Sequence, residues 1–378
     1  MKKSKTKRMI VDDMLLTTDA PTTAGSKMLE GYQSPVEATV ITKARAVGYT
    51  LAMKTPVGEF AIDLLGETSA DGTHVREGIL KNASAEMLLS GNAEAALCLD
   101  VNGYPRRAAA QMGLVCLKPT YGAIAREGIV SVAASGETVN VLAKSTADCR
   151  ALFDAVAEGP IKESTPVCRV AVLSSLDFDM DTDIKQKIGT AASTLEKSGI
   201  SITYIENDLI SVSKAAWNTI LCAELCKSTA RYDGIRYGHR TKNFSNLNEL
   251  YTNSRTEGLG DLVKAAILWG SETLSAKNYA KIYEKALRVR RVITEEFSNL
   301  FEIFDAILLP ACSAVGYTQE QVVQEKYTVF EENRYTAPAT LAGLPAVVSG
   351  GVQLIGNAYS ENALLDVAKI LAEGGQII

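Results

Sequence analysis

The sequence contains little of what imidazole-dependent hydrolases and metalloenzymes require. Only two histidines occur in 378 residues, His74 and His239, and neither lies beside a plausible serine or cysteine nucleophile. The seven cysteines lack the spacing of a disulfide framework. Cys222 and Cys226 share a face of a predicted helix, but no second pair or histidine completes a metal site. We therefore expect no metal, no cofactor and no Ser-His-Asp or Cys-His chemistry.

Long apolar runs and a strong charge bias are also absent. No segment reaches the roughly 18 consecutive apolar residues that a membrane span requires. The basic N-terminus, MKKSKTKRMIVDD, lacks the apolar core and cleavage site of a signal peptide. A net charge of −5 predicts no general attraction to nucleic acid or anionic membranes. With 47% hydrophobic and 22% charged residues, the composition favours a globular cytoplasmic protein.

Short apolar runs alternate with amphipathic helical segments along the chain. Strands are expected at 8–12, 49–54, 113–117, 167–174, 200–206, 305–311 and 344–356. Helices are expected at 37–47, 83–98, 181–199, 211–230, 261–303 and 361–374. The alternation predicts an α/β fold in which helices cover both faces of a central mixed β-sheet. We expect one domain over residues 1–378, with about 205–300 as a mainly helical insertion.

Seven segments occur in an order that resembles the amidase-signature family, and within it the A-type chain of the glutamyl-tRNA(Gln) amidotransferase. They are TTAGSKMLEGYQSPVEATVITKARAVG, AMKTPVGEF, GLVCLKPTYGAIAREGIV, ARYDGIRYGHRTKN, SRTEGLGDLVK, KNYAKIYEKALRVRRVITEEF and YTAPATLAGLPAVVSGGVQLIG. The resemblance implies the amidase-signature fold. It also implies a mechanism in which a serine attacks an amide and a second serine relays its proton to a neutral lysine.

The same resemblance indicates that this machinery has been replaced. The family's DTGGSIRQPAA falls on DVNGYPRRAAA, which places Tyr104 at the nucleophile position. A phenol with an ordinary pKa near 10 is a poor acyl nucleophile. The relay serine falls on Leu80 or Lys81, and we favour Leu80, whose side chain has no proton to relay. The lysine of the family's IAIKDN falls on Asp12, so a general base amine becomes a carboxylate.

Lys54 and Ser84 could in principle supply a missing base and a missing relay hydroxyl. The alignment with the family motifs assigns both to other positions. Lys54 belongs to a separate family motif, in which the lysine is not the base. Ser84 matches the last serine of the glycine- and serine-rich run rather than the relay serine. We therefore predict that Asp12, Leu80 and Tyr104 mark a vestigial triad.

The positions that imply glutamine recognition are changed as well. The family's EVKRRI reads LVKAAI, which puts Ala265 and Ala266 where a basic residue lies near the glutamine carboxylate. Asn333 replaces an acidic residue ahead of YTAPATLAGLP, so the amine of glutamine also loses its anchor.

Two arginines are candidates for a ligand or partner contact. Arg107 lies beside the former nucleophile position, although a salt-bridged or solvated arginine is the commoner outcome. Arg236 lies in YDGIRYGHR, where packing of Tyr232 and Tyr237 is the simpler interpretation. The family's N-terminal helices are missing from the sequence, and part of the family's subunit interface lies near them.

Three functions follow from these observations. The first is a non-catalytic homologue of the A-type chain, a pseudoenzyme that acts as scaffold or regulator beside B- and C-like subunits. The second is an amidase or glutamine amidotransferase with an altered mechanism that uses Asp12. The third is a small-molecule binding protein that uses the remodelled cleft. The sequence has no direct nucleic-acid signature.

Overall fold

A ten-stranded mixed β-sheet forms the centre of the computed structural model, which describes residues 7–159, 163–174 and 180–374. Its strand order is β2-β1-β5-β7-β6-β11-β12-β10-β8-β9. The strands are β1 (Lys7–Asp12), β2 (Tyr49–Thr55), β5 (Ala95–Asp100), β6 (Val115–Lys118), β7 (Thr138–Ala143), β8 (Arg169–Leu173), β9 (Ser201–Ile205), β10 (Ala306–Leu309), β11 (Ala346–Ser349) and β12 (Val352–Gly356). A separate hairpin joins β3 (Val75–Arg76) and β4 (Ile79–Leu80).

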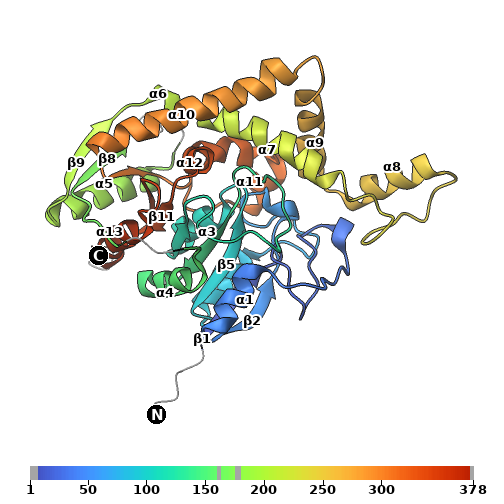
Figure 1. The fold of residues 1–378 in the computed structure, drawn as a ribbon, viewed down its shortest axis with the longest axis horizontal. Coiled ribbons are helices and arrows are strands. Elements are labelled where there is room, and N and C mark those ends of the chain that lie inside the picture. Colours follow the sequence, from blue (N-terminus) through green and yellow to red (C-terminus); the bar gives the residue numbers. More distant parts are fainter. Residues whose placement is uncertain (1–6, 160–162, 175–179, 375–378) are drawn as a thin grey trace, which may run out of the picture.

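Helices pack on both faces of this sheet, and Figure 1 shows their arrangement. One layer consists of α1 (Thr39–Ala46), α4 (Thr146–Val156), α13 (Glu361–Gly374) and α5 (Thr182–Lys197), which contact one another in that order. The other layer begins with α2 (Ala83–Leu89) and α3 (Tyr104–Met112). The predicted α/β fold, with a mixed sheet covered by helices, is confirmed.

A helical region lies between β9 and β10 in the chain and extends the second layer (Figure 1). It contains α6 (Asp208–Ser211), α7 (Ser213–Thr229), α8 (Leu247–Gly258), α9 (Asp261–Thr273), the π-helical turn η3 (Tyr279–Tyr283) and α10 (Glu284–Ile303). After β10 follow α11 (Gln319–Gln324) and α12 (Thr328–Ala342). The short turns η1 (Lys27–Leu29) and η2 (Glu59–Ala61) lie near the start of the chain. Helix α7 packs against α9, α10 and α12. The assignment of residues 1–378 to one domain stays a prediction.

One predicted helix is partly wrong. The alanine- and leucine-rich segment 83–98 is helical only over Ala83–Leu89, and its last residues belong to β5. Every residue of β5 is buried, because the strand lies between β1 and β7 with helices on both faces. Small residues suit such a site, so tertiary packing overrides the helical propensity of alanine.

The sheet brings distant residues to one edge. Strands β1 and β5 are parallel neighbours, so their carboxyl ends lie together, with Asp12 ending one and Asp100 the other. Helix α3 begins four residues after Asp100, with Pro105 in its first turn. The basic residues 1–6, on which the signal-peptide prediction rests, lie outside the described residues. Within the described chain, no helix has both the length and the apolar character needed to cross a membrane.

Candidate functional site

Asp12 and Tyr104, which the resemblance places at the family's lysine and nucleophile positions, contact each other where β1 ends and α3 begins. The Tyr104 hydroxyl donates to Asp12 Oδ2, and both side chains are buried. The backbone N–H of Leu99 donates to the same oxygen at 2.7 Å, and that of Met14 donates to Oδ1 at 3.1 Å. Three donors therefore surround a carboxylate that has no cation as a direct partner among the described residues.

Burial dominates the ionisation of this pair. Desolvation raises the pKa of Asp12 to about 6, although the Tyr104 hydroxyl and the two backbone N–H groups oppose the shift. Desolvation and the neighbouring Asp12 charge raise the pKa of Tyr104 well above its ordinary value. The phenol therefore stays protonated and acts as a hydrogen-bond donor rather than as a nucleophile.

A polar chain continues from this pair. Burial and the Asp12 charge raise the pKa of the Cys98 thiol, which lies within hydrogen-bonding reach of Ser84 and Tyr104. The Ser84 hydroxyl in turn lies 2.6 Å from the Thr55 hydroxyl. All these side chains are buried, so the chain of groups stabilises the core and is closed to solvent.

Leu80 occupies the predicted relay position but takes no part in this polar chain. It lies in β4, its side chain is buried, and its backbone N–H donates to the carbonyl of Tyr317 at 2.8 Å. The apolar side chain adds core packing where the family places a hydroxyl.

The turn between β5 and α3 is fixed by a buried ion pair. Arg106 Nε donates to Asp100 Oδ2 at 2.7 Å, and neither side chain is exposed. The other guanidinium nitrogens donate to Thr336, Thr340 and Gln353. Burial is the largest single influence and would raise the pKa of Asp100. The charge and hydrogen bond of Arg106, the Lys118 charge and the Gly103 N–H together outweigh it and hold that pKa below its ordinary value. Arg106 is thus committed to a buried ion pair with Asp100.

Neighbouring side chains fill the space in front of this turn. Gly103 has a φ of 89°, and a Cβ there would lie 2.6 Å from the Thr336 side chain. Asn102 replaces the family's first glycine, and its Oδ1 accepts a hydrogen bond from Trp217 Nε1 at 3.1 Å. Its Nδ2 donates to the Ile62 carbonyl at 2.7 Å. Asn102 and Trp217 are both buried, so they close the turn.

Arg107 is also fully buried. Its Nη2 and Nε donate to the carbonyls of Asp63 and Leu64 at 2.9 Å and 3.2 Å. Its side chain has no exposed surface in this conformation, and its role as a partner contact stays a prediction. Its role toward a small ligand stays a prediction.

Lys54 lies near the pair but has its own acceptors. Its Nζ lies 2.8 Å from Asp13 Oδ1 and also donates to Thr22 Oγ1 at 2.6 Å. Burial lowers the pKa of Lys54, while the Asp13 and Asp12 charges oppose that shift. The lysine is therefore committed to an ion pair with Asp13.

The predicted recognition positions lie at a different place, on the helical region. Ala265 and Ala266 in α9 line a cavity of about 490 Å³ together with Asn218 of α7. Asn333 of α12 lies behind this wall and donates from Nδ2 to Asn218 Oδ1 at 2.6 Å. The structure thus brings the three recognition positions close to one another. The Asp12–Tyr104 pair does not line this cavity.

Arg236 lies in an exposed loop after α7, where its contact role stays a prediction. The nearby tyrosines pack as expected: Tyr232 is buried and stacks on Phe60 at 5.4 Å, and Tyr237 lies 6.3 Å from Tyr232.

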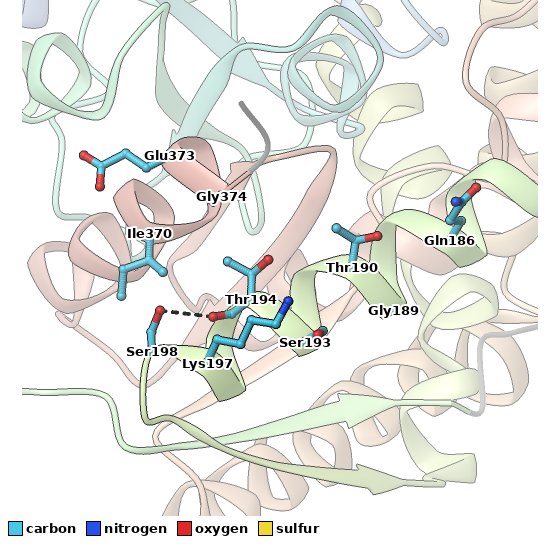
Figure 2. Close-up of a pocket in the computed structure, with 10 residues that line it drawn as sticks. All are labelled: Gln186, Gly189, Thr190, Ser193, Thr194, Lys197, Ser198, Ile370, Glu373 and Gly374. Carbon is cyan, nitrogen blue, oxygen red and sulfur yellow. Dashed lines mark hydrogen bonds between the residues drawn. The ribbon is translucent and has the colours of Figure 1, made fainter. Parts of the chain in front are cut away.

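A further groove of about 900 Å³ lies between α5 and α13 (Figure 2). Figure 2 shows Thr190, Thr194 and Lys197 on α5, with Ile370 and Glu373 on the neighbouring α13. None of the predicted site residues lines this groove.

Sequence patterns did not predict several buried residues around Tyr104 and Arg107. Asp63 is buried beside Arg107, and Cys98 and Thr55 join the polar chain. Their position beside family motifs was the one available signal. Each contact joins segments far apart in sequence, and such contacts leave no local pattern.

Comparison with known proteins identifies the family. A family model described as Amidase matches residues 84–365. The A-type chain of the glutamyl-tRNA(Gln) amidotransferase of Acinetobacter baumannii strain AYE is 33% identical over 393 residues, covering 94% of this chain and 80% of that relative. Its counterpart in Symbiobacterium thermophilum is 31% identical over 392 residues, covering 95% and 80%.

Solved structures give the same result. The A-type chain of the glutamyl-tRNA(Gln) amidotransferase of Thermotoga maritima superposes with a TM-score of 0.79 at 25% identity, covering 97% of this chain and 82% of that one. An allophanate hydrolase of Kluyveromyces lactis shares the fold, with a TM-score of 0.81 at 23% identity, covering 98% of this chain and 63% of that one. As the ordered segments predicted, the chain belongs to the amidase signature family.

Proposed function

We propose that this chain is a non-catalytic homologue of the A-type chain of the glutamyl-tRNA(Gln) amidotransferase and acts as a scaffold or regulatory component. The buried Tyr104–Asp12 pair carries this proposal. An acyl nucleophile must give its proton to a base and reach a substrate carbonyl. Tyr104 is 1% exposed and has a raised pKa, so it meets neither condition. Leu80 offers no relay between the two positions.

The substrate side supports the same proposal. Free glutamine carries a carboxylate and an ammonium group, and each needs a charged partner when it leaves water. Ala265, Ala266 and Asn333 provide neutral groups where the family places charges. Loss of recognition and loss of catalysis therefore point to the same outcome.

The proposed role is within a complex. The relatives are named as subunits, which supports B- and C-like amidotransferase subunits as partners. Arg236 lies in an exposed loop and is a candidate contact. We place this complex in the cytoplasm, with residues 1–378 acting as one domain.

Coexpression with the B- and C-like subunits of the same organism tests the proposal. We expect the three chains to copurify and glutamate release from glutamine to stay at background. The matched control is the same complex assembled with an A-type chain that keeps the serine–serine–lysine triad. Release above background that disappears in Asp12→Ala would contradict the proposal, as would failure to copurify.

A second candidate is an amide hydrolase with an altered mechanism. Burial brings the pKa of Asp12 to about 6, close to the range in which a general base works, and the carboxylate contacts a hydroxyl. This candidate predicts hydrolysis of some amide with an ionisation near pH 6 in its rate profile. Asp12→Asn would remove both the activity and that ionisation.

A further inference from the structure

The cavity on the helical region carries an inference beyond the proposed function, because it holds whether or not catalysis is lost. We propose that this cavity binds an uncharged aromatic molecule with a hydrogen-bond donor. It lies between α7, α9 and the start of α12, about 490 Å³ in volume. Cavities that bind small molecules usually measure about 300–1,000 Å³.

Small side chains create this volume, and a backbone contact keeps it open. Ala215 of α7 and Ala265 and Ala266 of α9 all line the cavity. Helices α7 and α9 approach closely because α9 has glycine at position 270. A Cβ at Gly270 would lie 2.0 Å from the Cys222 carbonyl oxygen. The wall is therefore set by backbone packing and needs no ligand to form it.

Aromatic side chains give the cavity its selectivity for a flat ring. Trp269 and Tyr327 line the cavity, yet they remain 53% and 51% exposed. Phe330 adds a third ring to the lining. Aromatic rings gain both apolar burial and stacking energy from a planar ligand. An aromatic molecule between these rings would cover apolar surface that now faces water.

The charge distribution excludes an ionic ligand. Among the lining residues Lys214 is the one with a formal charge, and its Nζ forms an ion pair with Glu331 Oε2. Glu331 also pairs with Arg334 at 2.7 Å, and its pKa is lowered, first by Lys214. Because Lys214 is already paired with Glu331, a ligand carboxylate would lose water and would have to compete with Glu331 for this cation.

The polar part of the lining is an acceptor. Asn218 Nδ2 donates to the Phe330 carbonyl at 2.9 Å, and its Oδ1 accepts from Asn333 Nδ2 at 2.6 Å. A carbonyl oxygen has two lone pairs, so Asn218 Oδ1 can accept a second hydrogen bond. Asn333 Oδ1 is buried without a hydrogen-bond partner among the described residues. An N–H or O–H group on the ligand can donate to Asn218 Oδ1, since Asn218 lines the cavity and Asn333 lies behind it.

Fluorescence of the intact protein with N-phenyl-1-naphthylamine tests the inference. This probe is uncharged, aromatic and carries one N–H. Trp269 lines the cavity, and Trp217 directly precedes the lining residue Asn218 in α7, so both tryptophans can transfer energy to a probe in the cavity. We expect saturable probe emission with energy transfer that Trp269→Phe reduces, with the remainder coming from Trp217. Indole should displace the probe, whereas indole-3-acetate should need at least about fivefold more and glutamine should not compete.

A matched pair of arginine variants on α9 locates the site. Ala265 lines the cavity, whereas Leu268 is 71% exposed and does not line it. We expect Ala265→Arg to weaken probe binding by at least about tenfold and Leu268→Arg to change it by less than about twofold. Trp269→Ser serves as a second lining variant in case Ala265→Arg unfolds, with circular dichroism as the fold control. The inference is wrong if folded protein does not bind the probe. It is also wrong if both arginine variants bind it equally or if indole-3-acetate competes as well as indole.

Discussion

The two regions where the resemblance places catalysis and recognition differ in opposite ways from the family pattern. At the turn between β5 and α3, Tyr104 and Asn102 stand where the resemblance implies small residues, and Trp217 covers the turn. On α9, small side chains leave a cavity at Ala265 and Ala266. One region is core and the other is a pocket. Under the proposed loss of activity, substitution adds stability in one place and leaves a new binding surface in another.

The largest test of this difference is the buried ion pair of the turn. Arg106→Met leaves the Asp100 carboxylate buried without its guanidinium partner. We expect a loss of about 3–5 kcal/mol in the free energy of unfolding, measured by urea denaturation. Arg236→Met, in the exposed loop, is the control and should change that free energy by less than about 0.5 kcal/mol. Equal losses in Arg106→Met and Arg236→Met would show that the buried ion pair contributes no more to stability than an exposed arginine.

The pH dependence of stability tests the burial of Asp12. Its folded pKa of about 6 lies above the ordinary value of 3.8, so the folded state holds the proton more tightly. The resulting stabilisation is complete below pH 3.8 and is lost as pH rises through about 6, by up to about 3 kcal/mol. Glu59, whose pKa burial raises to about 7, adds a slope of the same sign. The difference in unfolding free energy between the wild type and Asp12→Asn, measured against pH, therefore isolates Asp12. A difference that does not change with pH would contradict the burial of Asp12 as a titrating carboxyl group.

The Tyr104 hydroxyl tests the contact itself. Tyr104→Phe keeps the ring that fills the core but removes the donor to Asp12 Oδ2. We expect a loss of about 2 kcal/mol at pH 7, where the carboxylate is ionised. In the Asp12→Asn background the same change should cost less, because the acceptor is then neutral. A double-mutant cycle without coupling energy would contradict a stabilising contact between the two residues.

The smallest effect is expected at the cavity. Ala265 is only partly buried and faces open volume, so Ala265→Arg can extend its side chain without displacing core atoms. We expect its free energy of unfolding to change by less than about 1 kcal/mol. A loss as large as that of Tyr104→Phe would mean that the cavity wall is part of the core.

Sequence patterns predicted the sheet better than they predicted the site. Apolar alternation located β1, β2 and β10, because these strands are short and bounded by turns. It failed at β5, because the helical propensity of alanine is too weak to outweigh packing between two strands. The family match identified Asp12 and Tyr104 separately, in segments 92 residues apart. Their contact depends on β1 and β5 being parallel neighbours, which no local pattern encodes.

The same limit applies to charge. The sequence gives Arg106 and Arg107 as adjacent cations, yet one is paired with Asp100 and the other is held by carbonyls of Asp63 and Leu64. The partners of Arg107 depend on the path of the segment before β3, whereas Arg106 meets Asp100 six residues upstream. The cavity was equally hidden, because Ala265 and Ala266 indicate a lost charge but not the volume that remains.

The Asp12–Tyr104 contact makes the change of this turn difficult to reverse by single steps. A lysine at position 12 would set an ammonium against the N–H groups of Leu99 and Met14 and the Tyr104 hydroxyl, all of which now donate to Asp12. A serine at position 104 alone would leave a void in place of the ring, at a cost of about 3–5 kcal/mol. Each residue thus defines the background in which the other is tolerated. A lineage that carries this pair would reach a serine–lysine arrangement only through less stable intermediates.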